Sequence, residues 1–117
     1  MTGRNDRHTD HHVWQVSTCV DSPEAAQALA LGAVGGRLAA CAQVSGPVSS
    51  TFWWSDAVQT AQEWTVLLKT SAQQYGALEA YLRQAHPYEV PEILATAVVA
   101  GSAPYLAWVR AETSGRE

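Results

Sequence analysis

Residues 48–70 read VSSTFWWSDAVQTAQEWTVLLKT, and this stretch decides the fold. Its first half is rich in β-branched and aromatic residues, which favour an extended strand. Ser55-Asp56-Ala57 can form a turn. The second half alternates, so that Trp64, Val66 and Leu68 share one face of a strand. The stretch therefore predicts a long β-hairpin.

The hairpin is too long for the body of a single small domain. Its second strand, predicted at 58–70, has 13 extended residues. Such a strand spans about 43 Å at about 3.3 Å per residue, whereas a compact domain of this size is about 35 Å across. A projecting two-stranded ribbon is only marginally stable in water. We therefore expect a homo-oligomer, with Trp53, Trp54 and Trp64 at the interface between subunits.

Shorter patterns on both sides of the hairpin complete an α+β domain. Capping motifs predict two helix starts, at Asp21-Ser22-Pro23-Glu24 and at Ser71-Ala72-Gln73-Gln74. Further strands are predicted at 13–18, 38–44 and 93–100, and a last helix at 103–112. The order β-α-β-β-α-β-α predicts a ferredoxin-like sandwich, in which helices cover one face of an antiparallel sheet.

The chain is long enough for one domain. With 117 residues and 47% hydrophobic residues, it can bury a core. We predict a disordered N-terminal tail at 1–12, the folded domain at 13–112 and a C-terminal tail at 113–117. His8, His11 and His12 lie in the first tail, where they could bind a stray metal ion or simply be solvated.

Charge and cysteine content restrict the partners and the compartment. The net charge is −4, and residues 13–112 carry all of the excess negative charge. Without a basic stripe, nucleic acids and anionic membranes are poor partners. The sequence shows no signal peptide and no run near the ~18 apolar residues of a membrane span. Cys19 and Cys41 form no disulfide framework, so we expect a cytoplasmic protein with reduced thiols.

The densest polar cluster is HPYEVPE at residues 86–92. His86, Glu89 and Glu92 are side chains that bind divalent metals such as Cu(II), and they could also act as general base and acid. The alternative is a plain connection from a helix to a strand, with His86 capping the helix. Cys19 could be a soft copper ligand or a small buried residue.

Six short blocks, spread in order along residues 13–112, resemble the CutA divalent-cation tolerance proteins. The most diagnostic is the block at 86–92, with His-Pro-Tyr followed by Pro-Glu. The six blocks are Ser17-Thr18-Cys19, Arg37-Leu38-Ala39-Ala40-Cys41, Phe52-Trp53-Trp54, Leu68-Lys69-Thr70, residues 86–92 and Tyr105-Leu106-Ala107-Trp108.

The resemblance implies a ferredoxin-like fold and tight homotrimers whose hairpins pair between subunits, with an architecture similar to that of the PII signalling proteins. It also implies a link to tolerance of copper and other divalent cations. No catalytic activity is established for the family. The predicted metal ligands are therefore His86, Glu89, Glu92 and Cys19, holding Cu(II) or another divalent cation weakly, with no metal required for folding.

This chain departs from the pattern of a copper-binding family member at two positions. Thr18 stands where that protein has a cysteine, and Ala85 stands where it has a second histidine. Cys19 is adjacent to Thr18 and is therefore expected on the opposite face of the strand. Among the family's ligands only His86 and Glu92 match, which is why we expect weak binding.

Three other functions remain as alternatives. A PII-like signalling trimer would bind a small anionic metabolite between subunits, through clustered Arg or Lys side chains. A trimer could also act purely as a structural scaffold. An acylphosphatase-type enzyme would need an Arg in the loop after the first strand, where Asp21 stands instead. With no nucleophile motif or phosphate loop visible, we expect that the protein is not an enzyme.

Overall fold

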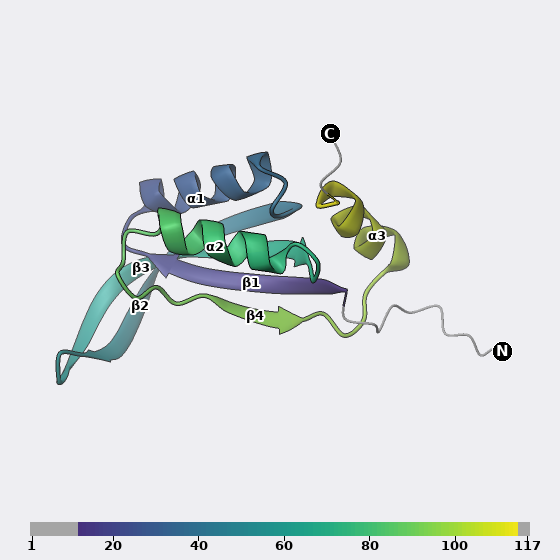
Figure 1. Ribbon diagram of the computed structural model, residues 1–117. Coiled ribbons are helices and arrows are strands. Elements are labelled where there is room, and N and C mark those ends of the chain that lie inside the picture. The colour runs from purple at the N-terminus through teal and green to yellow at the C-terminus, as the bar shows by residue number, and fades with distance from the viewer. Residues whose placement is uncertain (1–11, 115–117) are drawn as a thin grey trace.

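The computed structural model describes residues 12–114, which form a four-stranded sheet and three helices (Figure 1). The sheet has the order β2-β3-β1-β4, and every neighbouring pair is antiparallel. The predicted α+β order β-α-β-β-α-β-α is confirmed. The elements are β1 (Val13–Val20), α1 (Pro23–Gly35), β2 (Cys41–Trp54), β3 (Ala57–Ser71), α2 (Tyr75–Ala85), β4 (Leu94–Ala97) and α3 (Ala103–Glu112).

Helices α1 and α2 cover one face of the sheet (Figure 1), and the main core lies beneath them. Alternate residues of the two central strands supply its floor, because successive side chains of a strand point to opposite faces. The helices contribute small and branched side chains such as Leu29, Leu78 and Leu82. Fully buried strand residues include Val16, Val20, Val66 and Leu68.

The two predicted helix starts differ in outcome. Ser22 caps α1 as predicted, since its Oγ accepts a hydrogen bond from the backbone N–H of Ala25 at 3.0 Å. The Oγ of Ser71 likewise accepts from Gln74 N–H at 3.2 Å, but α2 begins only at Tyr75. Gln74 N–H also bonds to the carbonyl of Ser71 at 3.1 Å, so a tight turn precedes the helix.

Strand β2 begins at Cys41, three residues later than the predicted start at Leu38. The end of α1 explains the delay. The N–H groups of Leu38 and Ala39 both bond to the carbonyl of Ala33, and Arg37 has a left-handed φ of 61°. These residues therefore close the helix before the chain becomes extended.

The predicted interruption at Gly46-Pro47 is a shift of register in a continuous strand. The ladder between β2 and β3 skips from Ser45 to Val48 and then continues to Trp54. Gly46 has a φ of +150°, and an added Cβ would lie 2.6 Å from Trp64. Only glycine allows the indole to pack this closely on the bulge.

The hairpin of β2 and β3 projects from the body (Figure 1). The molecule extends 56 × 32 × 21 Å, and its longest dimension is well beyond that of a compact domain. All residues from 51 to 60 are exposed. The sequence-based expectation that the tip reaches beyond its own domain is confirmed.

Strand β4 and helix α3 complete the far end of the molecule. β4 pairs with β1 only over Leu94–Ala97, which is shorter than the predicted strand at 93–100. Helix α3 has the predicted bounds and buries Leu106 and Val109 against Val13.

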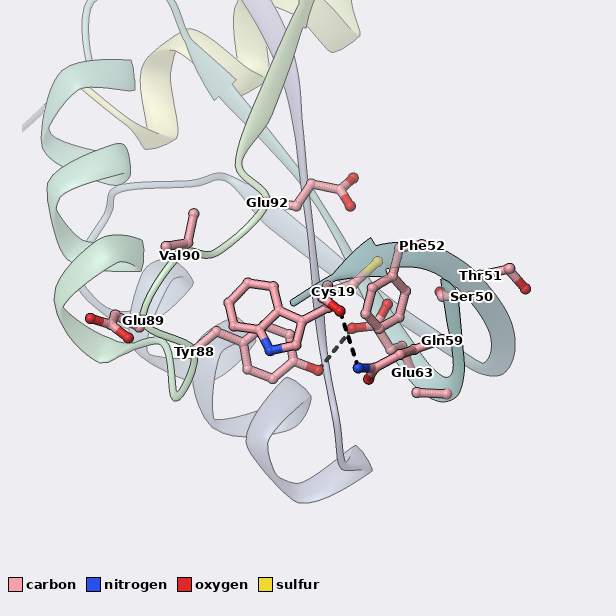
Figure 2. A pocket seen from close by; sticks show the side chains of 12 residues that line it. Cys19, Ser50, Thr51, Phe52, Gln59, Glu63, Tyr88, Glu89, Val90 and Glu92 are labelled. Carbon is pink, nitrogen blue, oxygen red and sulfur yellow. Dashed lines mark hydrogen bonds between the residues drawn. The ribbon is translucent and has the colours of Figure 1, made fainter. Parts of the chain in front are cut away.

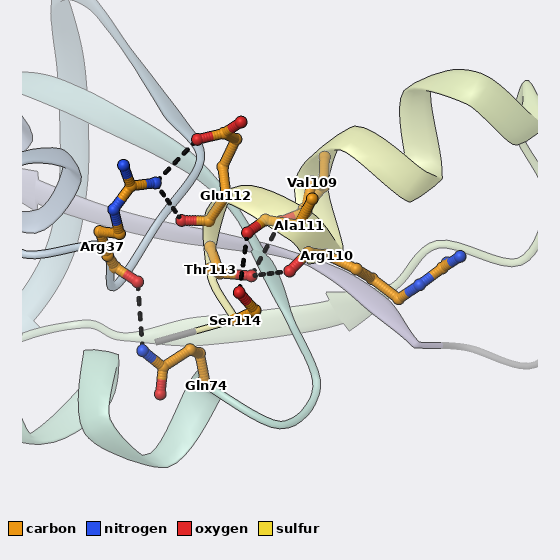
Figure 3. Close-up of polar contacts among 8 residues, drawn as sticks. All are labelled: Arg37, Gln74, Val109, Arg110, Ala111, Glu112, Thr113 and Ser114. Carbon is orange, nitrogen blue, oxygen red and sulfur yellow. Dashed lines mark hydrogen bonds and ion pairs between the residues drawn. The ribbon is translucent and has the colours of Figure 1, made fainter. Parts of the chain in front are cut away.

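Arg37 and the end of α3 join the two halves of the chain (Figure 3). The Arg37 guanidinium donates to the carboxylate of Glu112 at 2.7 Å and to its backbone carbonyl at 3.1 Å. Thr113 is 2% exposed, and its hydroxyl donates to the Val109 carbonyl at 2.8 Å. Thr113 therefore belongs to the folded helix end and not to the predicted tail at 113–117.

The predicted N-terminal tail lies outside the described residues, apart from His12. The carbonyl of His12 accepts a hydrogen bond from Ala72 N–H at 2.8 Å. No helix in residues 12–114 is both long and apolar enough to cross a membrane.

Candidate functional site

A cleft of about 710 Å³ opens between one face of the hairpin and the loop that follows α2 (Figure 2). The hairpin forms one wall, the loop forms the other, and Cys19 at the end of β1 lies between them. The lining residues are Cys19, Ser50, Thr51, Phe52, Trp54, Gln59, Ala61, Glu63, Tyr88, Glu89, Val90 and Glu92.

The hairpin wall follows from the two-residue period of its strands. Phe52 pairs with Gln59 across the ladder, and Ser50 pairs with Ala61. Directly paired residues of an antiparallel ladder point to the same face, and so do residues two apart on one strand. Glu63 therefore lies on the same face as Gln59 and Ala61. The wall combines an aromatic outer part with a carboxylate near the body.

His86 ends α2 with an extended ψ of 139°, and Pro87 prevents the helix from continuing. His86 is 7% exposed. Its Nε2 lies 2.9 Å from the carbonyl of Cys19, and its Nδ1 accepts the backbone N–H of Tyr88 at 3.1 Å. An Nδ1 that accepts leaves the proton on Nε2, which donates to the carbonyl. Burial lowers the pKa of His86, so the ring is neutral and uses both nitrogens.

Tyr88 connects the loop to the hairpin. Its hydroxyl donates to Glu63 Oε2 at 2.8 Å, and its ring lies 4.8 Å from the imidazole of His86. Burial, followed by the hydrogen bond and charge of Glu63, raises the pKa of the Tyr88 phenol well above its usual value. The phenol therefore stays protonated and holds the loop against β3.

The Cys19 thiol faces the cleft, with Sγ 3.5 Å from Thr65 Oγ1. Burial raises the pKa of this thiol, and the charges of Glu92 and Glu63 raise it further. Thr18 is fully buried on the core side of β1, and its hydroxyl has no hydrogen-bond partner among the described residues. Cys19 and Thr18 thus lie on opposite faces of the strand, as the alternation predicts.

Three of the four predicted metal ligands, Cys19, Glu89 and Glu92, line this cleft. His86 lies behind it, with both nitrogens in hydrogen bonds. The carboxylates of Glu89 and Glu92 point to different sides (Figure 2). Within residues 12–114, no three His, Cys, Asp or Glu side chains converge closely enough to hold a metal ion. The residues do not fit a preformed metal centre.

The three tryptophans predicted at an interface have different positions. Trp54 lines the cleft, whereas Trp53 pairs with Val58 on the opposite face and is 74% exposed. Trp64 packs against the main core of its own chain. Its side chain therefore has an intramolecular role, and only Trp53 and Trp54 are presented on the projecting hairpin.

Sequence reasoning missed the partnership of Tyr88 with Glu63 and the role of Phe52 as a wall of the cleft. Part of the signal was present. Cys19 pairs with Thr65 in the β1–β3 ladder, so a residue two positions from Thr65 shares its face with Cys19. The approach of the 88–92 loop to that face depends on tertiary packing and has no local signal.

The family profile of the CutA1 divalent ion tolerance protein matches residues 14–112. The chain belongs to the CutA1 family. The divalent-cation tolerance protein CutA of Thermus thermophilus is 36% identical over 94 residues, which cover 80% of this chain and 91% of that protein. The crystal structure of CutA1 from rice superposes with a TM-score of 0.86 at 30% identity, covering 90% of this chain and 96% of that one.

Other CutA relatives show how widely this domain occurs. The human protein CutA is 35% identical over 96 residues, which cover 82% of this chain. The chain spans about half of the length of the curated rice and human relatives, 55% and 53% respectively. The rice protein is described as chloroplastic, and a CutA of Archaeoglobus fulgidus is described as periplasmic.

Proposed function

We propose that this CutA family member acts in divalent-cation tolerance as a homotrimer, and that it binds Cu(II) or another divalent cation weakly at the 86–92 loop. The observation that carries the metal proposal is that Cys19, Glu89 and Glu92 line one cleft. Carboxylate oxygens and a sulfur are donors for divalent metals of intermediate softness.

The described geometry supports weak binding only. The Cys19 thiol is protonated, because burial raises its pKa, and a thiol must lose its proton to bind a metal. His86 would have to give up the bond to Tyr88 N–H or the bond to the Cys19 carbonyl. Both requirements lower the affinity relative to a preformed site.

Isothermal titration with Cu(II) tests this proposal on wild type, His86→Ala and Glu92→Gln. If both side chains are ligands, each change weakens binding by about tenfold or more. Glu79→Gln is the matched control, because Glu79 lies on α2 beside Arg83 and outside the cleft. Equal affinity in wild type and His86→Ala would remove His86 from the site, and equal affinity in all variants would reject the loop as the binding region.

The trimer proposal rests on the exposed apolar residues of the hairpin. Phe52, Trp53, Trp54 and Val58 are between 38% and 74% exposed. A monomer rarely leaves such a group of large apolar side chains open to water. Pairing with other copies through the face of Trp53 and Val58, opposite the cleft, would cover apolar surface and support the projecting ribbon.

We place the protein in the cytoplasm and assign it no catalytic step. Cys19 and Cys41 are both free cysteines, and reducing compartments keep thiols in this form. The cleft holds a thiol, a phenol and carboxylates, but burial raises the pKa of both Cys19 and Tyr88. Neither group is thereby activated as a nucleophile or base near neutral pH.

A further inference from the structure

The cleft has the size and wall composition of a site for a small organic molecule. Its volume of about 710 Å³ falls within the range of ~300–1,000 Å³ that is typical of ligand pockets. Phe52, Trp54 and Tyr88 supply aromatic surface from both walls. Aromatic side chains bind organic ligands through large flat contacts at low cost in conformational entropy.

The charge of the lining is entirely negative. Glu63, Glu89 and Glu92 line the cleft, and no Lys or Arg does. Three of the four basic side chains of the described region have partners elsewhere: Arg37 binds Glu112, Arg83 lies beside Glu79, and Lys69 donates to Gln43. The fourth, Arg110, belongs to the last turn of α3 and does not line the cleft. The carboxylates therefore create a negative potential in the cleft, and no Lys or Arg among the lining residues of the described region neutralises it.

These two properties together select a class of ligand. An anionic metabolite would meet three carboxylates and no base. A neutral apolar molecule would remove water from the carboxylates without compensating their charge. A weakly bound metal ion would use some of the polar donors, which do not converge on one point, and would make no use of the aromatic walls. An organic cation can combine distributed carboxylates with contact to aromatic faces.

We propose that the cleft between the hairpin and the 88–92 loop binds a small organic cation, such as a protonated amine that carries an aromatic or apolar group. The apolar group lies against Phe52 and Trp54, and the ammonium group lies toward the Glu63 and Glu92 side. Tyr88 positions the Glu63 carboxylate through its 2.8 Å hydrogen bond. This proposal is independent of metal binding.

Three probes of similar shape and different charge test the proposal on the intact chain in its native oligomeric state. They are 2-phenylethylammonium, 2-phenylethanol and phenylacetate, titrated at neutral pH in the presence of EDTA and followed by NMR chemical shifts. We expect the cation to bind about tenfold more tightly than the alcohol, and phenylacetate to bind more weakly still. Because EDTA removes divalent metals, failure of the metal proposal leaves this result unaffected.

Two variants locate the binding site. Glu92→Gln removes one charge from the cleft, and Trp54→Leu removes one aromatic wall; each should weaken binding of 2-phenylethylammonium by about three- to tenfold. Glu79→Gln, the same change of charge on α2 outside the cleft, should bind as wild type does. Glu92 is exposed, so its replacement leaves folding intact even if Trp54→Leu does not.

Several outcomes would overturn the proposal. Equal affinity of the alcohol or phenylacetate and the cation would remove the role of charge. Unchanged binding of the cation in both cleft variants would place its site elsewhere. If no probe binds at concentrations up to about 10 mM, the binding free energy is weaker than about 3 kcal/mol. That result would mean that the cleft is closed, for example by a second copy of the chain.

Discussion

At the scale of single residues, His86 has a structural role, although histidine is a common metal ligand and acid–base catalyst. It stands at the end of α2, where its Nε2 joins the helix to the carbonyl of Cys19 on β1. Its Nδ1 holds the backbone of Tyr88 at 3.1 Å, which sets the direction of the loop. The imidazole thereby determines where the loop wall of the cleft begins.

The neutral state of His86 predicts a pH dependence of stability. Burial lowers the pKa of the folded state below the ordinary value of 6.5, so the unfolded chain binds more protons at mildly acidic pH. The stabilisation from His86 is therefore complete above about pH 6.5 and decreases as the pH falls toward the folded-state pKa. Urea unfolding between pH 7.5 and 5.5 should show the loss, and His86→Gln should flatten the curve. Parallel curves for the two proteins would contradict this assignment, because the other histidines are common to both.

At the scale of elements, the contact between α1 and α2 depends on a glycine within a helix. Gly32 lies in α1, where glycine normally costs ~0.5–1 kcal/mol relative to alanine. An added Cβ there would overlap the hydroxyl oxygen of Tyr81 on α2. The glycine thus leaves room for the Tyr81 side chain between the two helices that cover the sheet.

Replacing glycines by alanine should therefore have opposite effects at two helical positions. Gly76→Ala in α2 meets no atom within 4 Å and should stabilise the protein by up to about 1 kcal/mol. Gly32→Ala must displace Tyr81 and should instead destabilise it by about 1–3 kcal/mol. The free energy of unfolding in urea measures both. A gain for Gly32→Ala equal to that of Gly76→Ala would show that Tyr81 moves without cost.

At the scale of the whole molecule, the hairpin separates two adjacent tryptophans. Trp54 faces the cleft, and Trp53 faces the opposite side, where it shares exposed apolar surface with Val58. One arm therefore presents apolar side chains on both faces, far from the core of its own chain. Such a ribbon is only marginally stable by itself in water, which is why we expect it to contact other copies.

The exposed hairpin predicts the oligomeric state and its sensitivity to mutation. Sedimentation at micromolar concentration should show a trimer for wild type. Trp53→Ser should raise the protein concentration at which half of the chains are assembled by about tenfold or more, because large aromatic side chains dominate interface energies. Leu31→Ser is the matched control, because Leu31 is 66% exposed on α1 and far from the hairpin in sequence. A monomeric wild type, or equal effects of the two changes, would reject the hairpin as the assembly surface.

The class of fold and the bounds of several elements were predictable because their signals are local. Ser22 and Pro23 indicate the start of α1, and α3 has the predicted range. The alternation of β3 correctly predicts which residues enter the core. The local signal was less exact at Ser71, because its hydroxyl and carbonyl both accept from Gln74 N–H in a turn that precedes the helix.

The candidate site was predictable only in part. Cys19, Glu89 and Glu92 were selected by type, and they do line one cleft. Residue type does not report which hydrogen bonds a side chain already makes, and this is why His86 was expected as a free ligand. Glu63 drew no notice in the sequence, because its importance depends on Tyr88, which is 25 residues away along the chain.

The sequence by itself determined the order of the elements, the faces of the strands and the excess length of the hairpin, since capping, alternation and strand rise act over a few residues. Only the tertiary structure decided that the 88–92 loop faces the hairpin and encloses an aromatic, acidic cleft. The physical reason is that this wall is held by long-range hydrogen bonds, from His86 to Cys19 and from Tyr88 to Glu63. Those bonds join residues 67 and 25 positions apart in the chain, so only the packing of the sheet and its helices brings the partners together.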